Sequence, residues 1–256
     1  MKTAIIAIAK CEEPYIEEWI NYHLDKGFSR IIIADNDDSL VLSKYEGECV
    51  VIEDYTGVEG VQPIAYKDLF LKYRSEYDWI LFIDVDEFLV MEKCSNVNAY
   101  LQSLPQDVDM IRLNCKHFTD GDELDVVDGN YNVFNRFTTP VSCENDRFAK
   151  SFVNTKVNRE IRFCGHGLVG EYKSVDAEGA PCKNQKKLDC VLHRTAWINH
   201  YRTKTIGEYI RQKYQRGGPN KNPLRYSNWK WYFKVTNNLT PEKIEYTQKV
   251  IDSLST

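Results

Sequence analysis

The sequence predicts an α/β protein with a mostly parallel sheet flanked by helices. Strand-like apolar runs alternate with helical runs from the first residues onward, which is the pattern of a parallel sheet with crossover helices. The run at residues 79–83 is apolar without alternation, as expected for a strand buried on both faces. Such sheets bind ligands outside the carboxyl ends of their strands, so the candidate site is expected there.

Local signals define the expected elements. In the first helix, Pro14 suits the first turn, acidic residues crowd the N-terminus and Gly27 ends the segment. A last short helix should start at Thr240-Pro241-Glu242, because Thr suits an N-cap and Pro the first turn. The expected strands are residues 3–9, 30–34, 49–54, 79–83 and 110–118, and the other expected helices are 13–26 and 65–77.

Composition limits the class of protein. The 256 residues carry a net charge of -5 and are 43% hydrophobic, which is ordinary for a soluble globular protein and unlike a nucleic-acid binder. The apolar start is short and runs into Lys10, so we interpret it as the first strand and not as a signal peptide. Eight cysteines without a Cys-x-x-Cys motif favour reduced thiols in the cytosol. A zinc cluster could be imagined from Cys164, His166, Cys182, Cys190 and His193, but their spacings fit no common zinc pattern.

Three carboxylates follow the apolar run 79–83. Asp84 and Asp86 either share a face or are splayed around one point by a bend, and both arrangements allow them to converge on a cation. A hard ion such as Mn²⁺ or Mg²⁺ prefers carboxylate oxygens and keeps positions for water and phosphate. The alternative is an acidic turn after a core strand.

The stretch Asp84-Val85-Asp86-Glu87-Phe88 resembles the metal-binding signature of nucleotide-sugar glycosyltransferases with the GT-A fold, which is Rossmann-like. The resemblance is strongest to the family 92-like branch of the family 2 superfamily and covers about residues 1–217. In one place the chain departs from the pattern, with Cys11 where the motif usually has Asn. The other matching stretches are Lys10-Cys11-Glu12, Ala34-Asp35-Asn36, Lys150-Ser151 and Asn199-His200-Tyr201-Arg202-Thr203-Lys204.

This resemblance implies metal-dependent, inverting transfer of a sugar from a UDP-sugar to a hydroxyl of a glycan or glycolipid. His200 would be a further metal ligand, and Lys150 would counter the charge of the β-phosphate. Glu12 and Asp35 follow strand ends and would contact the base and ribose. Residues implied to lie near the donor also include Lys10, Gln62, Tyr66, Arg202 and Lys204.

An inverting transfer also needs a carboxylate that accepts the proton of the acceptor hydroxyl. Asp120 and Asp122 on a Gly-containing loop are the candidates, although the same residues suit an ordinary turn. Here the chain lacks the Gly-Ser-Ser-Gly-like residues frequent in this branch. Glu171 and Asp146 are the next carboxylates to test.

The C-terminal part is basic and aromatic. We expect a glycosyltransferase domain at residues 1–217 and a helical extension at 218–256 packed on it. Aromatic and basic residues between Tyr226 and Lys234 would suit peripheral contact with the inner face of an anionic membrane, where lipid-linked acceptors sit. They would equally suit capping the sheet or stacking on sugar rings.

Two other functions fit the same carboxylates and fold. One is a nucleotidyl- or phosphotransferase, which would bind a nucleoside triphosphate. The other is a non-catalytic module that binds sugar nucleotides or carbohydrates.

Overall fold

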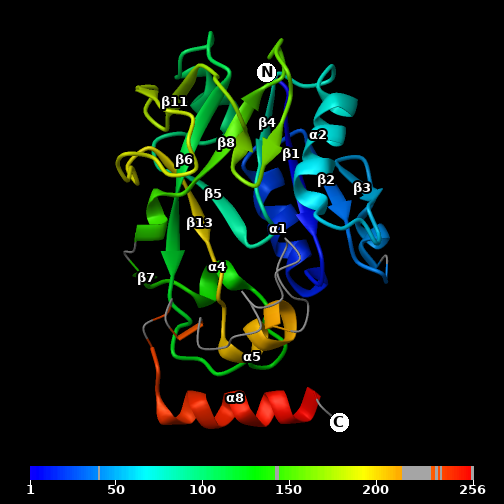
Figure 1. Ribbon diagram of the computed structural model, residues 1–256, viewed down its shortest axis with the longest axis vertical. Coiled ribbons are helices and arrows are strands. Elements are labelled where there is room, and N and C mark those ends of the chain that lie inside the picture. The colour runs from blue at the N-terminus through cyan, green and yellow to red at the C-terminus, as the bar shows by residue number, and fades with distance from the viewer. Residues whose placement is uncertain (40, 142–143, 215–231, 234–235, 237, 255–256) are drawn as a thin grey trace. The chain divides into compact units, whose positions relative to one another are not determined.

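The computed structural model describes residues 1–256 except 40, 142–143, 215–231, 234–235, 237 and 255–256 (Figure 1). The chain divides into two compact units. The first comprises Met1–Lys116 and Ser142–His200, and the second comprises His117–Val141 and Tyr201–Thr256. The boundary expected after residue 217 falls outside the described residues, so the division at that point stays a prediction.

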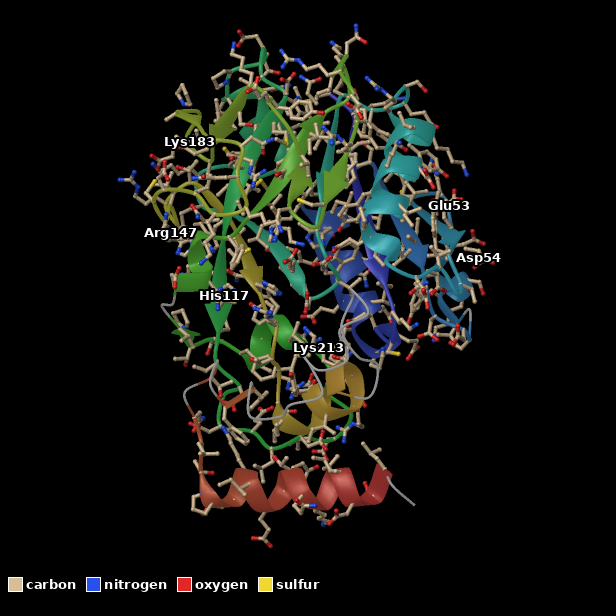
Figure 2. All side chains as sticks on the ribbon, viewed as in Figure 1. Glu53, Asp54, His117, Arg147, Lys183 and Lys213 are labelled. Atoms are coloured by element: carbon tan, nitrogen blue, oxygen red, sulfur yellow. The ribbon has the colours of Figure 1, made fainter. Side chains whose placement is uncertain are left out.

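The first unit is built on a large sheet whose first half is parallel. Its strands run in the order β4, β1, β2, β3, which brings their carboxyl ends to one edge. β3 is the outer strand, and its last residues Glu53 and Asp54 lie at the margin of the unit (Figure 2). These strands are β1 (Thr3–Ala9), β2 (Arg30–Asp35), β3 (Val50–Asp54) and β4 (Trp79–Phe82).

An antiparallel strand continues the sheet on the other side of β4. β8 lies between β4 and β6 and is antiparallel to both. β11 pairs with β6 in parallel, and β12 pairs with β11 in antiparallel orientation. These strands are β6 (Met110–Phe118), β8 (Ala149–Asn154), β11 (Ser174–Asp176) and β12 (Pro181–Cys182). The expected α/β class with flanking helices is confirmed.

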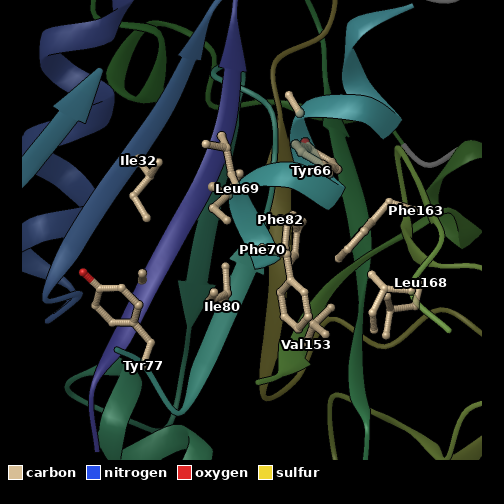
Figure 3. Close-up of a cluster of buried hydrophobic side chains, with 14 of the residues drawn as sticks. Ile32, Tyr66, Leu69, Phe70, Tyr77, Ile80, Phe82, Val153, Phe163 and Leu168 are labelled. Atoms are coloured by element: carbon tan, nitrogen blue, oxygen red, sulfur yellow. The ribbon is translucent and has the colours of Figure 1, made fainter. Parts of the chain in front are cut away.

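Helices cover both faces of this sheet. Tyr66 and Phe70 of α2 (Val61–Tyr73) pack against Phe82 of β4 and Phe163, within one apolar cluster (Figure 3). Because strand side chains alternate, Leu81 and its partner Phe152 face the opposite way, where Phe152 meets Phe28 and Tyr100. The helices on that second face are α1 (Glu13–Asp25) and α3 (Val97–Gln102), which contains Tyr100.

Two smaller strands, which the sequence analysis did not identify, run beside each other. β5 (Glu87–Met91) begins directly after the carboxylate motif and pairs antiparallel with β13 (Ala196–His200). The remaining elements of this unit are short: β9 (Phe163–Cys164) with β10 (Gly167–Leu168), and the 3₁₀ turns η1 (Val41–Tyr45) and η2 (Glu144–Arg147).

The expected boundaries hold best where turn signals are strong. The strands expected at 3–9 and 110–118 are confirmed at both ends, and the last helix begins at Pro241 as expected. The helix expected at 65–77 is misplaced, because α2 starts at Val61 and ends at Tyr73. The helix begins directly after Gly60, whose φ of 60° is a left-handed conformation that glycine adopts readily. The apolar spacing of the segment alone had indicated a later start.

The second unit joins a long loop to C-terminal helices. A capping box, in which Thr205 and Glu208 bond to each other's backbone N–H, starts α5. Its apolar cluster includes Ile206, Tyr232 and Val250. The elements are α4 (Val133–Arg136), β7 (Pro140–Val141), α5 (Ile206–Tyr209), the π-helical turn η3 (Ile210–Tyr214) and α8 (Pro241–Leu254).

Candidate active site

The carboxylate motif forms a tight turn between β4 and β5. Glu87 N–H donates to the Asp84 carbonyl over 3.0 Å, and Asp84 N–H donates to Glu87 Oε2 over 2.9 Å. A ligand oxygen from each of Asp84, Asp86 and Glu87 lies within 4.8 Å of the others. The bend between the strands therefore gathers all three carboxylates around one point, as the sequence allowed.

His200 reaches this point because of strand register. It is the last residue of β13 and lies directly opposite Glu87 in the antiparallel pair. His200 Nε2 is 3.5 Å from Asp86 Oδ1, and His200 Nδ1 is 3.4 Å from Glu87 Oε1. The imidazole thus stands between two carboxylates that belong to the motif, 113 positions or more earlier in the sequence.

Lys150 supplies a buried positive charge to the same turn. From β8, its Nζ lies 2.7 Å from Asp84 Oδ2 and 2.9 Å from Glu87 Oε2. Burial alone would lower the pKa of Lys150, but Asp84 and Glu87 hold it well above its usual value. Burial raises the pKa of Glu87 to about 8 although Lys150 opposes this, and Asp84 and Asp86 add to the shift.

Gln62 and Tyr66 hold the other side of Asp84. Gln62 Nε2 donates to Asp84 Oδ1 over 2.8 Å, and the Tyr66 hydroxyl donates to the same oxygen over 3.3 Å. A Cβ at position 165 would lie 2.6 Å from Gln62 Oε1, so Gly165 leaves room for the amide. The structure places Gln62 and Tyr66, which the family resemblance put near the nucleotide, on the metal-motif carboxylate.

Three of the predicted donor residues lie at the same edge of the parallel strands. Lys10 and Glu12 follow β1, and Asp35 ends β2 level with Ala9. Asp35 is fully buried, and its Oδ1 accepts the Asp37 N–H over 2.9 Å. Asp35 Oδ2 has no hydrogen-bond partner in the described part of the chain. Burial raises the pKa of Asp35, although the Asp37 N–H opposes the shift.

The other predicted residues belong to the second unit. Asp120 is fully buried; its Oδ2 accepts from the Tyr232 hydroxyl over 2.6 Å and pairs with Lys243. Asp122 is close by, with 87% of its side chain exposed. Lys204 is buried, and its Nζ donates to Gln212 over 3.0 Å, while Arg202 is half-buried and its carbonyl accepts from Lys213.

The sequence analysis assigned no role to two residues at the site, Glu87 and Cys115. Glu87 could have been found, because it adjoins the paired aspartates in the motif. Cys115 gave no signal, since it is a single cysteine within an expected strand and belongs to no Cys-x-x-Cys motif. Two groups of possible metal ligands occur in the described ranges. One is Asp84, Asp86 and Glu87, and the other is Glu87, Cys115 and His200. Neither contains any of the cysteine and histidine residues that the sequence analysis considered as a zinc cluster.

The described side chains fit a divalent cation. The turn gathers three carboxyl groups around one buried lysine, so acidic groups outnumber basic ones there. Carboxylate oxygens and an imidazole nitrogen converge from strands far apart in sequence. Such a donor set suits Mn²⁺ or Mg²⁺ with positions left for phosphate oxygens.

A family comparison agrees with this geometry. The model of glycosyltransferase family 92 matches residues 14–253. The chain belongs to glycosyltransferase family 92. The match covers both the carboxylate turn and His200, and it extends through the second unit to the last helix. The family assignment confirms the resemblance noted in the sequence.

Solved structures show more distant similarity. Residues covering 60% of this family 92 chain align with TarS of S. aureus in complex with UDP, at 17% identity and a TM-score of 0.40, over 47% of the TarS chain. Mannosyl-3-phosphoglycerate synthase from Rubrobacter xylanophilus aligns over 60% of this chain and 53% of its own, at 9% identity and a TM-score of 0.35. The chain therefore spans about half the length of each. Among curated proteins, no sequence matches.

Proposed function

We propose that this protein transfers a sugar from a nucleoside diphosphate, UDP, to a hydroxyl of a glycan or glycolipid acceptor. The observation that carries the proposal is the gathering of Asp84, Asp86 and Glu87 at the β4–β5 turn, with His200 set beside Asp86 and Glu87 by the β5–β13 register. Family 92 membership supports sugar transfer as the chemistry of this site. UDP and inversion of the anomeric centre follow from the family resemblance and not from a described contact.

In this proposal a divalent cation, Mn²⁺ or Mg²⁺, is held by Asp84, Asp86 and His200. When bound, it supplies Lewis-acid neutralisation of the leaving diphosphate. Gln62 and Tyr66 fix the orientation of Asp84 through their hydrogen bonds. Lys150 adds a positive charge that burial makes more effective than an exposed lysine would be.

The nucleotide is proposed to bind along the carboxyl ends of β1 and β2. The unpartnered Asp35 Oδ2 supports this, because a buried carboxylate oxygen without a donor is costly unless a ligand supplies one. A ribose hydroxyl or a pyrimidine ring N–H is such a donor. Lys10 and Glu12 follow the neighbouring strand, and we assign them to the same part of the donor site. The phosphate contacts that the family resemblance implies for Arg202 and Lys204 stay predictions.

The general base is assigned to the loop that carries Asp120 and Asp122. Asp120 already accepts hydrogen bonds on both oxygens, from Tyr232 and from Asn238 over 3.1 Å. Asp122 Oδ1 also accepts from Asn238, but 87% of the Asp122 side chain is exposed, so an acceptor hydroxyl can approach it. We therefore favour Asp122 as the residue that takes the acceptor proton and Asp120 as a support for the loop.

Peripheral contact with a membrane stays a prediction, because most of the stretch from Tyr226 to Lys234 lies outside the described residues. Within the described ranges, no helix combines the length and hydrophobicity needed to cross a bilayer.

Metal-dependent hydrolysis of UDP-sugars tests the proposal. The enzyme should release UDP slowly in the presence of Mn²⁺, and Asp86→Ala should lower that rate by about 100-fold or more, because loss of a direct ligand should cost at least as much as loss of an outer-shell partner. Glu17→Ala, on an exposed face of α1, is the matched control and should retain the rate. Unchanged turnover in Asp86→Ala would refute the metal assignment. Pyrophosphate release from a nucleoside triphosphate would instead indicate a nucleotidyltransferase, and binding without any release would indicate a binding module.

A further inference from the structure

A second group of possible metal ligands shares Glu87 with the carboxylate turn. Ligand atoms of Glu87, Cys115 and His200 lie within 4.8 Å of one another. These three residues come from β5, β6 and β13 of the first unit. A thiol, an imidazole and one carboxylate form a softer donor set than the oxygens of Asp84 and Asp86, and one that Zn²⁺ prefers.

One pair of ligand atoms in this group, from His200 and Glu87, has the spacing expected at a tetrahedral centre. Two N or O ligands placed 2.0–2.1 Å from a zinc ion at the tetrahedral angle lie about 3.3 Å apart. His200 Nδ1 and Glu87 Oε1 are 3.4 Å apart. Glu87 is fully buried, and its Oε1 has no hydrogen-bond partner in the described part of the chain. An unsatisfied carboxylate oxygen therefore points into the group.

We propose that Glu87, Cys115 and His200 Nδ1 bind a thiophilic divalent cation, Zn²⁺, and that this binding excludes the activating cation from Asp84, Asp86 and His200 Nε2. The second half of the inference rests on the proposed function, whereas the first half does not. Binding releases the thiol proton to solvent and forms a zinc–sulfur bond. The Glu87 carboxylate and the Cys115 thiolate then balance the charge of the ion.

The exclusion follows from the chemistry of the imidazole. A neutral imidazole has one lone pair available to a metal, and its other nitrogen carries a proton. With zinc on Nδ1, Nε2–H faces Asp86 Oδ1 at 3.5 Å, which is a carboxylate–histidine–zinc arrangement. With the activating ion on Nε2, Nδ1–H faces Glu87 Oε1 instead. His200 can therefore serve one metal at a time.

Cobalt binding tests the first half. Co²⁺ replaces Zn²⁺ in thiolate sites and gives a near-ultraviolet sulfur-to-cobalt charge-transfer band. The wild-type protein should show this band and lose it when Zn²⁺ is added. Cys115→Ser should lack the zinc-sensitive band, while Cys94→Ser, a half-buried cysteine outside the group, should keep it. If Cys115→Ser fails to fold, Cys115→Ala serves in its place. Absence of the band from wild type, or its persistence without Cys115, would overturn the inference.

Displacement of Mn²⁺ tests the second half. The electron paramagnetic resonance signal of free Mn²⁺ should rise when Zn²⁺ is added to the Mn²⁺-loaded wild type, and Cys115→Ser should need at least about tenfold more Zn²⁺ for the same release. Equal displacement in both proteins would show that Zn²⁺ simply enters the aspartate site and would overturn the exclusion. If the wild type bound no Mn²⁺, the proposed function would fail, while the cobalt band would still report on the site at Cys115.

Discussion

Lys150 Nζ, on β8, lies 2.7 Å from Asp84 Oδ2, in the turn that follows the adjacent antiparallel strand β4. The lysine also approaches Glu87 Oε2, so one buried ammonium group compensates two of the three carboxylates at the turn. Under the proposed function, a bound cation would add to the positive charge that Lys150 brings to the motif. This relationship makes the effect of removing the lysine depend on whether metal is present.

We expect Lys150→Met to destabilise the metal-free protein by about 3 kcal/mol, because removing the lysine leaves the buried Glu87 carboxylate without a counter-charge. Mn²⁺ should then raise the melting temperature of the variant more than that of wild type, since the cation replaces the missing charge. Thermal unfolding with and without Mn²⁺ measures both effects. Lys156→Met, an exposed position just after β8, is the control. Equal Mn²⁺ shifts in variant and wild type would contradict this account.

Gly165 should matter because of Gln62. A methyl group at position 165 would lie 2.6 Å from Gln62 Oε1 and push the amide away from Asp84. We expect Gly165→Ala to weaken Mn²⁺ binding by about 10- to 100-fold, the usual effect of losing a partner that orients a metal ligand. Isothermal titration with Mn²⁺ measures the change.

A double variant separates this effect from a general packing defect. In a Gln62→Ala background the clash is gone, so Gly165→Ala should cause little further loss of Mn²⁺ affinity. A full additional loss in the double variant would show that Gly165 acts through some other contact.

Asp120 and Asp122 should respond differently to the same substitution. Asp122→Asn should lower kcat by about 10²- to 10⁴-fold with donor affinity unchanged, because the amide cannot accept a proton. Asp120→Asn should instead lower the free energy of unfolding by about 3 kcal/mol, since it leaves the buried Lys243 ammonium with only the exposed Asp122 carboxylate, 3.9 Å away. Steady-state kinetics and urea unfolding on both variants distinguish the roles. A stable Asp120→Asn protein that has lost kcat would identify Asp120 as the base. If neither variant loses kcat, Glu171 and Asp146 are the next candidates.

His23 should make the fold sensitive to acid. Its Nε2 accepts the Leu89 N–H over 3.3 Å and its Nδ1 lies 2.8 Å from the Trp19 carbonyl, an arrangement that requires the neutral ring. Burial lowers the pKa of His23 from 6.5 to about 3. Because the folded pKa is depressed, the unfolded state binds the proton first, so stability is complete above about pH 6.5 and falls as the pH drops toward 3.

Between pH 7 and pH 5 this one group should remove about 2 kcal/mol from the free energy of unfolding. Urea unfolding of wild type and His23→Gln over that range measures the difference in pH dependence, even though the variant starts from lower stability. Parallel curves for the two proteins would exclude His23 as a source of the acid sensitivity.

Much of the first sheet was predictable because its signals are local. β1 and β6 match the expected strands at both ends, since the apolar residues that mark each strand and the polar residues that follow it lie within a few positions of each other. The carboxylate turn was predictable for the same reason. The start of α2 was predicted four residues too late, because the prediction used apolar spacing alone. The helix begins at Val61, directly after Gly60 in a left-handed conformation.

The sequence by itself determined the α/β class, the Asp84/Asp86 motif and, through resemblance, the family. The tertiary structure decided which distant side chains complete the site. Strand pairing brings Lys150 to Asp84 and sets His200 opposite Glu87, and packing of α2 places Gln62 on Asp84. Cys115 became a candidate ligand only through these pairings. Local patterns cannot encode such contacts, because strand register is set by burial and pairing across the whole sheet.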